Sequence, residues 1–194
     1  MTSRAKAFAA VALFAGAGLA PAFAAEVEGV KLPGTVRAAA GGPELVLNGA
    51  GVRTRVFFKV YVGALYLQKK TGDAKAVLSD AGAKRVAMHL LRDLSAEQLF
   101  TALNEGLRNN HSEGDLAKLD PQVAQLEGIF KAVKAAKTGD TILLDFAPGT
   151  GTRVTVNGES RGVIPGEEFS RALLRVWLGD QPADAALKKA MLGG

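Results

Sequence analysis

The stretch GAGVRTRVFFKVYVGALYL, residues 49–67, carries the strongest β-strand pattern in the chain and decides the fold. Valine, phenylalanine, tyrosine and leucine dominate it, and such residues are typical of strands. Arg53 and Arg55 stand at the start of this apolar run, and Lys59 and Tyr61 lie within it. These groups either lie on a solvated strand face, as strand arginines and lysines usually do, or hold a ligand.

A site made by Arg53 and Tyr61 requires a chain reversal inside this stretch. Eight residues on one straight strand span roughly 26 Å, so the two side chains meet only if the chain turns near residues 56–58. That segment contains no glycine, asparagine or proline, which are the usual turn residues. If the strand runs straight, Arg55 or Lys59 becomes the neighbour of Tyr61.

Residues 1–24 have the three parts of an export signal. Arg4 and Lys6 form a positive start, an apolar stretch follows, and Pro21-Ala22-Phe23-Ala24 ends in an A-x-A cleavage pattern. The apolar stretch is shorter than the roughly 20 residues of a membrane span. We therefore expect cleavage after Ala24, a periplasmic location and no stable membrane anchor, with a short N-terminal tether as the alternative.

The expected mature chain, residues 25–194, suits one domain and is long enough to bury a core. Its 22 lysines and arginines face 19 aspartates and glutamates, so its formal charge is +3 where the whole chain has +5. This thin excess forms no basic stripe, and nucleic-acid binding has no support. The absence of cysteine excludes disulfides, thiol redox chemistry and zinc–thiolate sites.

The sequence shows no pattern for a metal or a cofactor. The two histidines, His89 and His111, have no carboxylates at ligand spacing beside them, so we expect structural or surface roles for both. The run Gly149–Arg153 resembles a phosphate-binding loop, but it lies between two expected strands, where a hairpin connection is the simpler interpretation.

Hydrophobic periodicity and turn residues order the rest of the chain. Strands are expected over residues 27–38, 43–49, 84–93, 141–146 and 152–156, with a hairpin turn at Asn157-Gly158. Helices are expected from the capping box at Ser95, over 120–136 with Asp120 as cap, over 167–178 and 183–192, and briefly within 71–80. The order of strands, helices, strands and helices indicates an α+β domain.

Four segments also occur in an order and spacing that resemble the chalcone isomerase fold family. They are LNGAGVR at 47–53, FKVYVGALYL at 58–67, LLRDLSAEQL at 90–99, and GVIPGEEFSRALLRVWLGDQPADAALKKAML at 162–192. The likeness covers most of the mature chain and is strongest to exported bacterial chalcone isomerase-like proteins. It implies an open-faced sandwich, an antiparallel β-sheet with a layer of helices on one face and a ligand cleft between them.

The functional residues of that family carry over only in part. Arg53, in Gly-Ala-Gly-Val-Arg, matches the family arginine, and Tyr61 stands where the fatty-acid-binding members carry tyrosine and the enzymes threonine. The enzymes' helix tyrosine and asparagine fall on Leu99 and Gly106, and a serine or threonine of the penultimate helix falls on Arg171. Leucine and glycine side chains cannot donate to a substrate ketone, so most of the enzymes' catalytic set is missing.

The resemblance therefore implies a non-catalytic binding protein for a small apolar molecule with an acidic head, such as a fatty acid. Its expected ligand-binding residues are Arg53, Tyr61, Leu99, Gly106 and Arg171, without metal or cofactor. Two alternatives stay open: an isomerase of the intramolecular lyase type that acts through Arg53 and Tyr61, and an envelope protein-interaction module with a collapsed cleft. Leu99 and Gly106 either enlarge the cleft or let it close.

Overall fold

The computed structural model describes residues 23–38 and 41–194, so nearly all of the expected signal peptide lies outside the described residues. These described residues form eleven strands and six helices. The strands are β1 (Phe23–Val27), β2 (Val30–Pro33), β3 (Thr35–Arg37), β4 (Glu44–Arg55), β5 (Phe58–Leu67), β6 (Lys84–Leu90), β7 (Leu94–Ser95), β8 (Ala135–Ala136), β9 (Thr141–Ala147), β10 (Gly151–Val156) and β11 (Glu159–Ile164). The helices are α1 (Ala74–Ser79), α2 (Ala96–Asn110), α3 (Glu113–Ala117), α4 (Asp120–Val133), α5 (Glu167–Leu178) and α6 (Ala185–Met191).

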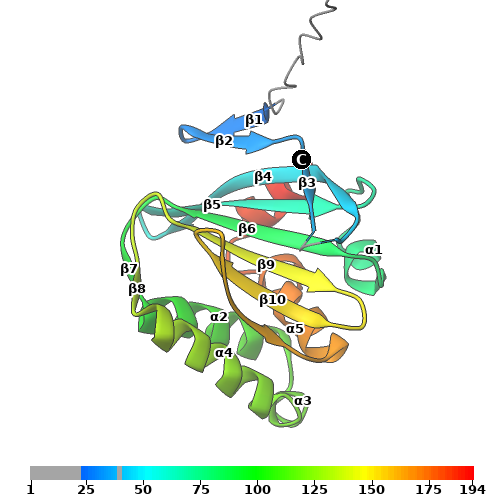
Figure 1. Cartoon of the computed structure of the whole chain (residues 1–194), viewed down its shortest axis with the longest axis vertical. Coiled ribbons are helices and arrows are strands. Elements are labelled where there is room, and N and C mark those ends of the chain that lie inside the picture. The colour runs from blue at the N-terminus through cyan, green and yellow to red at the C-terminus, as the bar shows by residue number, and fades with distance from the viewer. Residues whose placement is uncertain (1–22, 39–40) are drawn as a thin grey trace, which may run out of the picture.

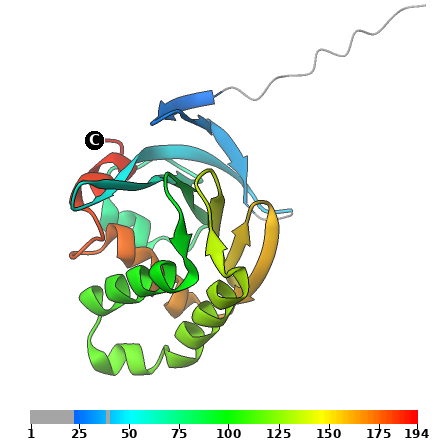
Figure 2. The same ribbon diagram turned by 90° about the vertical axis from the view of Figure 1, so that its left-hand side faces the viewer.

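A seven-stranded antiparallel sheet with the order β11-β10-β9-β6-β5-β4-β3 forms the centre of the molecule (Figure 1). The sheet curls, and its helices lie on the inner side of the curl (Figure 2). Helix α6 packs on β4, α5 packs on β10, and α2 packs on α5 and α4. This arrangement confirms the α+β class with helices on one face of the sheet.

The main core lies between the sheet and these helices, where apolar side chains of both layers are removed from water. Phe169, Leu173 and Trp177 on α5 are fully or almost fully buried there, together with Leu65 and Met88 from the sheet. The spacing of the three α5 residues along one helix face explains why the sequence indicated a core helix. None of the helices among residues 23–38 and 41–194 is long and apolar enough to cross a membrane.

The opposite face of the sheet carries a second, smaller core that the β1–β2 hairpin partly covers. Leu32 of β2 is buried with Leu45, Val62 and Tyr66 of the sheet. Because both faces of the sheet are covered here, the side chains of β5 are buried on both faces. A strand buried on both faces needs apolar residues at almost every position, and the sequence of β5 has them.

Helix α2 begins as its sequence predicts. The Ser95 hydroxyl accepts a hydrogen bond from the backbone N–H of Gln98 at 3.1 Å, and the Gln98 side chain accepts one from the backbone N–H of Ser95 at 2.9 Å. This reciprocal capping box satisfies two backbone donors that a helix start otherwise leaves unpaired. It also orients the first turn of α2, which borders the candidate site.

Helix α4 differs from its prediction at both ends. Leu119 occupies the cap position without a side-chain hydrogen bond, and Asp120 is already the first helical residue. The helix ends at Val133, because Lys134 adopts φ 67° and the next two residues pair with β7 as strand β8. Pairing with another strand thus ends the helix before residue 136, where periodicity alone placed its end.

The reversal inside residues 49–67 is a tight hairpin. Strand β4 ends at Arg55 and β5 begins at Phe58, with Arg55 opposite Phe58, so Val56 and Phe57 alone form the turn. Val56 adopts φ 59°, which β-branched residues rarely do. A register shift after Arg53 then brings Arg53 directly opposite Tyr61. The straight-strand alternative is therefore wrong, and Arg53 is the cross-strand neighbour of Tyr61.

Candidate functional site

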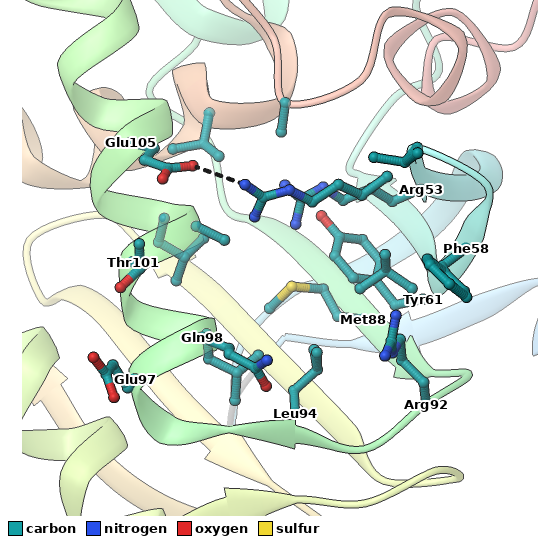
Figure 3. Close-up of a pocket in the computed structure, with 18 residues that line it drawn as sticks. Arg53, Phe58, Tyr61, Met88, Arg92, Leu94, Glu97, Gln98, Thr101 and Glu105 are labelled. Carbon is teal, nitrogen blue, oxygen red and sulfur yellow. Dashed lines mark ion pairs between the residues drawn. The ribbon is translucent and has the colours of Figure 1, made fainter.

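A cavity of about 380 Å³ opens between helix α2 and the β4–β5 hairpin (Figure 3). Its walls are largely apolar, with contributions from the hairpin, from β6 and from α2, and they include Val60, Met88, Leu94, Leu99, Leu103 and Val176. Charged side chains from both sides of the opening complete the lining, namely Arg53, Arg55, Arg92, Glu97 and Glu105. A largely apolar cavity with a few polar groups is the usual form of a small-molecule site.

Arg53 presents a partly desolvated cation to this cavity. Its guanidinium carbon lies 5.6 Å from the centroid of the Tyr61 ring, within the range of a cation–π contact. Its Nε is buried and has no hydrogen-bond partner among the described residues, and no carboxylate there forms an ion pair with it. Because buried donors are normally satisfied, the arginine is prepared to donate to an anion.

Asp184 is an acidic group held beside the residue that follows Arg53, and its carboxylate is already engaged. Its carboxylate accepts backbone hydrogen bonds from Thr54 at 2.9 Å and from Leu187 at 2.9 Å, the second of which caps helix α6. These two bonds tie the start of α6 to β4 beside Arg53. The carboxylate therefore serves the backbone, and among the described residues it forms no ion pair with Arg53.

Tyr61 is a buried phenol whose polar end is held in place from α5. The indole Nε1 of Trp177 donates a hydrogen bond of 2.8 Å to the Tyr61 hydroxyl oxygen. Burial raises the pKa of Tyr61 above its ordinary value of 10, although the Arg53 cation opposes this shift. Tyr61 thus stays protonated at neutral pH, and since indole only donates, the tyrosine keeps its own hydroxyl hydrogen to offer.

Both signs of charge occur at the mouth of the cavity. Arg55 lies 4.0 Å from Glu105 of α2, the ion pair drawn as a dashed line in Figure 3, and both side chains are more than half exposed. Arg92, from the segment after β6, lies over the ring of Phe58 at 4.9 Å from its centroid. Exposed pairs of this kind are weak, so the mouth can rearrange at little cost.

The two α2 positions expected at the site have different surroundings. Leu99 lines the cavity and is 6% exposed, so it supplies apolar wall. Gly106 instead lies where α2 crosses α5, and a Cβ placed on it would stand 2.7 Å from Cγ1 of Val176. It borders only an adjoining depression of about 200 Å³, which shares Arg53 and Arg55 with the cavity. Gly106 therefore permits close helix packing and does not enlarge the cavity.

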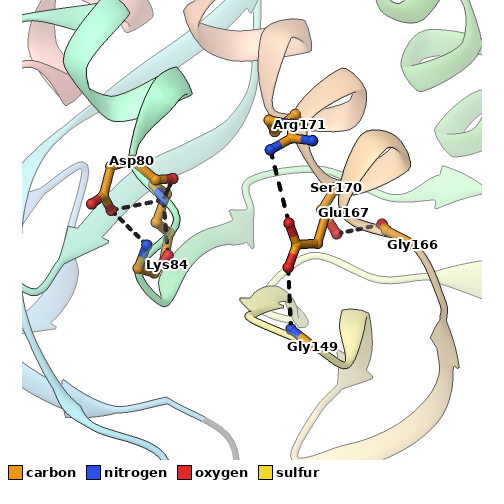
Figure 4. A network of polar contacts seen from close by, with 8 residues as sticks. Asp80, Lys84, Gly149, Gly166, Glu167, Ser170 and Arg171 are labelled. Atoms are coloured by element: carbon orange, nitrogen blue, oxygen red, sulfur yellow. Dashed lines mark hydrogen bonds and ion pairs between the residues drawn. The ribbon is translucent and has the colours of Figure 1, made fainter.

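Arg171 is placed away from the cavity. The site lies at the Tyr61–Leu90 end of the paired strands, whereas Arg171 lies near the opposite end, beside Lys84 (Figure 4). There Arg171 is 3.8 Å from Glu167 one helical turn earlier, and its side chain is half exposed. The structure therefore does not bring Arg171 together with Arg53, because residue 171 lies on a different turn and face of α5 from Trp177.

Both histidines have structural surroundings. His89 lies on the face of the sheet away from the cavity, where its Nδ1 is 3.1 Å from the Thr141 hydroxyl, and burial lowers its pKa. His111 follows α2, with Nε2 at 3.3 Å from the carbonyl of Ala172. Within residues 23–38 and 41–194 no group of histidine or acidic side chains has the arrangement of a metal site.

Two features escaped sequence reasoning, one in the cavity and one in β11 at the edge of the sheet. The bond from Trp177 to Tyr61 joins residues 116 positions apart, and no local pattern announces it. Residues 158–162, GESRG, match the G-x-S-x-G pattern of nucleophile elbows, but Ser160 lies in strand β11 after a hairpin turn and accepts a hydrogen bond from Arg153 at 3.4 Å. An elbow needs a strand-to-helix turn, so the match has no catalytic meaning here.

Comparison with known proteins agrees with this architecture. The family model described as chalcone isomerase-like matches residues 24–193. Among solved structures, a fatty-acid binding protein from Arabidopsis thaliana is similar, with a TM-score of 0.66, 17% sequence identity, and coverage of 84% of this chain and 92% of the plant chain. At that identity the likeness shows the shared fold. A search of curated proteins found no match. The extent of the family match and the sheet with its inner helices together show that this chain belongs to the chalcone isomerase-like family.

Proposed function

We propose that this protein is a non-catalytic, exported binding protein that holds a small apolar molecule with an acidic head, such as a fatty acid, in the cavity beside α2. The observation that carries the proposal is the buried Nε of Arg53, which has no hydrogen-bond partner in the described part of the chain and stands next to the neutral phenol of Tyr61. A carboxylate between them would accept charge-assisted hydrogen bonds from the guanidinium and a third from the hydroxyl.

The rest of the cavity suits the tail of such a ligand. Its inner wall is made by aliphatic side chains, among them Val60, Leu99 and Leu103. Each methylene group that leaves water against this wall contributes about 0.8 kcal/mol to binding. Hydrogen bonds to a charged group add about 1.5–3 kcal/mol each, so the head and the tail both contribute to the affinity, and the head also fixes the orientation.

Three further observations support binding over turnover. Leu99 and Gly106 provide no polar side chain at the two positions where the chalcone-closing enzymes carry tyrosine and asparagine. The raised pKa of Tyr61 keeps it from acting as a phenolate base near neutral pH. A protein of the same fold is named a fatty-acid binding protein, so this scaffold can hold such a ligand.

Export is the second part of the proposal and rests on residues 1–24, with their positive start, apolar stretch and A-x-A pattern. Cell fractionation followed by N-terminal sequencing tests it. A periplasmic protein that begins at Ala25 supports the proposal, and a cytoplasmic protein that keeps Arg4 and Lys6 contradicts it.

Ligand binding is tested by titrating the processed protein with cis-parinaric acid, a fluorescent fatty acid, and with its methyl ester. Arg53→Met should weaken binding of the acid by about 10–100-fold, since it removes the charged donors and keeps an apolar chain. Arg171→Met is the matched control and should bind as the wild type, because its cation lies near the other end of the sheet. The ester should bind both proteins with similar, lower affinity.

Mass spectrometry of small molecules extracted from gently purified protein identifies the natural ligand. An acidic lipid on the wild type and none on Arg53→Met supports the proposal. Equal affinity of wild type and Arg53→Met for parinaric acid would overturn it, and loss of binding in Arg171→Met instead would relocate the site to the other end of the sheet.

A further inference from the structure

The turn between β4 and β5 exposes an unusual amount of apolar surface. Val56, Phe57 and Phe58 are 76%, 92% and 61% exposed, and they are three of the four large hydrophobic side chains that the described residues expose to this degree. We call these three residues the hairpin tip. Single exposed apolar residues are common on protein surfaces, whereas a contiguous aromatic tip usually marks a contact surface.

The folding of the hairpin does not explain the tip. A two-residue turn favours residues that adopt positive φ, such as Asn-Gly, and this sheet uses that pair at Asn157-Gly158, with φ of 51° and 83°. The tip instead places Val56 at φ 59°, a strained value for a β-branched residue, and leaves Phe57 without packing. Neither residue is buried in the core of the folded chain, so their chemistry points to an external contact.

Three cationic side chains adjoin the tip, and the acidic Glu97 and Glu105 also lie at the mouth of the cavity. Arg55 and Lys59 flank it in the sequence, and Arg92 lies against the ring of Phe58. Lys59 is paired with Glu28 at 2.7 Å, and Arg55 lies 4.0 Å from Glu105. Arg92 forms no ion pair among residues 23–38 and 41–194. Aromatic side chains with arginines beside them suit an anionic lipid surface, where the rings enter the interface and the cations meet phosphate groups.

The tip and the mouth of the cavity share residues. Arg55, Val56, Phe58 and Arg92 line the cavity as well as forming or surrounding the tip (Figure 3). A surface that receives the tip therefore lies directly at the opening, on the side where Arg53 points its guanidinium. An apolar molecule with an acidic head would then pass between a bilayer and the cavity with little exposure to water.

We propose that the hairpin tip docks reversibly on an anionic bilayer, so that the cavity opens at the lipid surface. A bilayer fits better than a second copy of the chain, because three side chains cover roughly 500 Å² at most, less than the ~800 Å² per partner of a stable protein interface. Shallow insertion has no such area requirement. The inference goes beyond ligand binding and does not depend on it, since docking needs no occupant in the cavity.

The test is co-sedimentation of the processed, delipidated protein with vesicles of phosphatidylcholine alone or with phosphatidylglycerol added. We expect binding to the anionic vesicles, weaker binding to the neutral ones, and a decline with added salt. Phe57→Ser should reduce the partition coefficient between vesicles and water by about tenfold or more, because the variant lacks the aromatic ring that is buried in the lipid interface. Phe57 is almost fully exposed, so this variant should fold as the wild type, which circular dichroism checks.

Charge reversal provides the second arm. Arg92→Glu should weaken binding to anionic vesicles by about tenfold, whereas Lys75→Glu on α1, an exposed cation near the other end of the sheet, should change it by less than about threefold. Arg53→Met should bind vesicles about as well as the wild type even if it loses parinaric acid, so failure of docking and failure of ligand binding are told apart.

Two outcomes would overturn the inference. The first is vesicle binding by Phe57→Ser that equals that of the wild type, whether both proteins bind or neither does. The second is a wild-type dimer in sedimentation velocity that becomes a monomer in Phe57→Ser while neither protein binds vesicles, which would assign the tip to a second copy of this chain.

Discussion

The hydrogen bond from Trp177 to Tyr61 joins α5 to the sheet inside the core, and its removal should reveal strong coupling between the two residues. The nitrogen and oxygen are 2.8 Å apart, and the side chains are only 1% and 3% exposed. Tyr61→Phe deletes the acceptor and leaves a buried indole N–H unpaired, which costs about 1–3 kcal/mol of unfolding free energy. Trp177→Phe removes the donor and also vacates volume, which costs about 2 kcal/mol or more.

The double variant carries neither polar atom, so no unpaired group remains at this position. Its loss of unfolding free energy should therefore be smaller than the sum of the two single losses, by about 1 kcal/mol. A difference of that size corresponds to about 2–4 °C in Tm for a domain of this length. The sign of the coupling distinguishes a buried hydrogen bond from simple packing, in which each variant adds its own independent loss.

Urea unfolding followed by far-ultraviolet circular dichroism measures all four proteins alike, because Trp177 is the only tryptophan and its fluorescence would vanish in two of them. The m-values should stay equal across the set. Additive losses within about 0.5 kcal/mol, or a Tyr61→Phe variant as stable as the wild type, would refute the bond and its role in orienting the phenol.

Two further predictions concern packing and ionisation. Gly106→Ala should lower the Tm in thermal unfolding, because the new Cβ would meet Val176 Cγ1 at 2.7 Å. This clash outweighs the helix preference of alanine over glycine, which is about 1 kcal/mol. A Tm equal to that of the wild type would show that α2 and α5 pack less closely. Burial raises the pKa of both tyrosines in the chain, of Tyr66 to about 12, so ultraviolet titration of the folded protein should show little tyrosinate at pH 10. The tyrosines of the unfolded chain ionise first, so the unfolding free energy should fall above pH 10 by about 1.4 kcal/mol per pH unit for each tyrosine. Tyr61→Phe should remove the contribution of one tyrosine to this fall. Tyrosine ionisation in the folded protein with a midpoint near pH 10 would contradict the prediction.

Much of the fold follows from short-range patterns. The capping box at Ser95, the turn at Asn157-Gly158 and the apolar face of α5 each depend on residues within one or two turns of each other, and the structure confirms all three. The order of expected strands and helices indicated the α+β class, and the family resemblance added the layer of helices on one face of the sheet. The misplaced end of α4 shows the limit, since strand pairing of residues 135–136 overrides helical periodicity.

Of the candidate site, only the pair Arg53 and Tyr61 was predictable from the sequence. The apolar strand pattern and the family match single out Arg53 and Tyr61, yet both depend on a reversal at Val56-Phe57 that local turn preferences argue against. Pairing of β4 with β5 imposes that turn. The register that buries the apolar side chains of both strands also places Arg55 opposite Phe58, which leaves only two residues to connect the strands.

By itself, the sequence determined the class of fold, the candidate site residues such as Arg53 and Tyr61, and the chemistry of their side chains. These depend on residue type and on spacing along the chain. Only the tertiary structure decided which candidates share a site. It brought Trp177 to Tyr61 across 116 positions, used Gly106 to pack two helices, and placed Arg171 near the far end of the sheet. The physical reason is that packing and register are set by contacts between distant segments, and those contacts appear in no local pattern of residues.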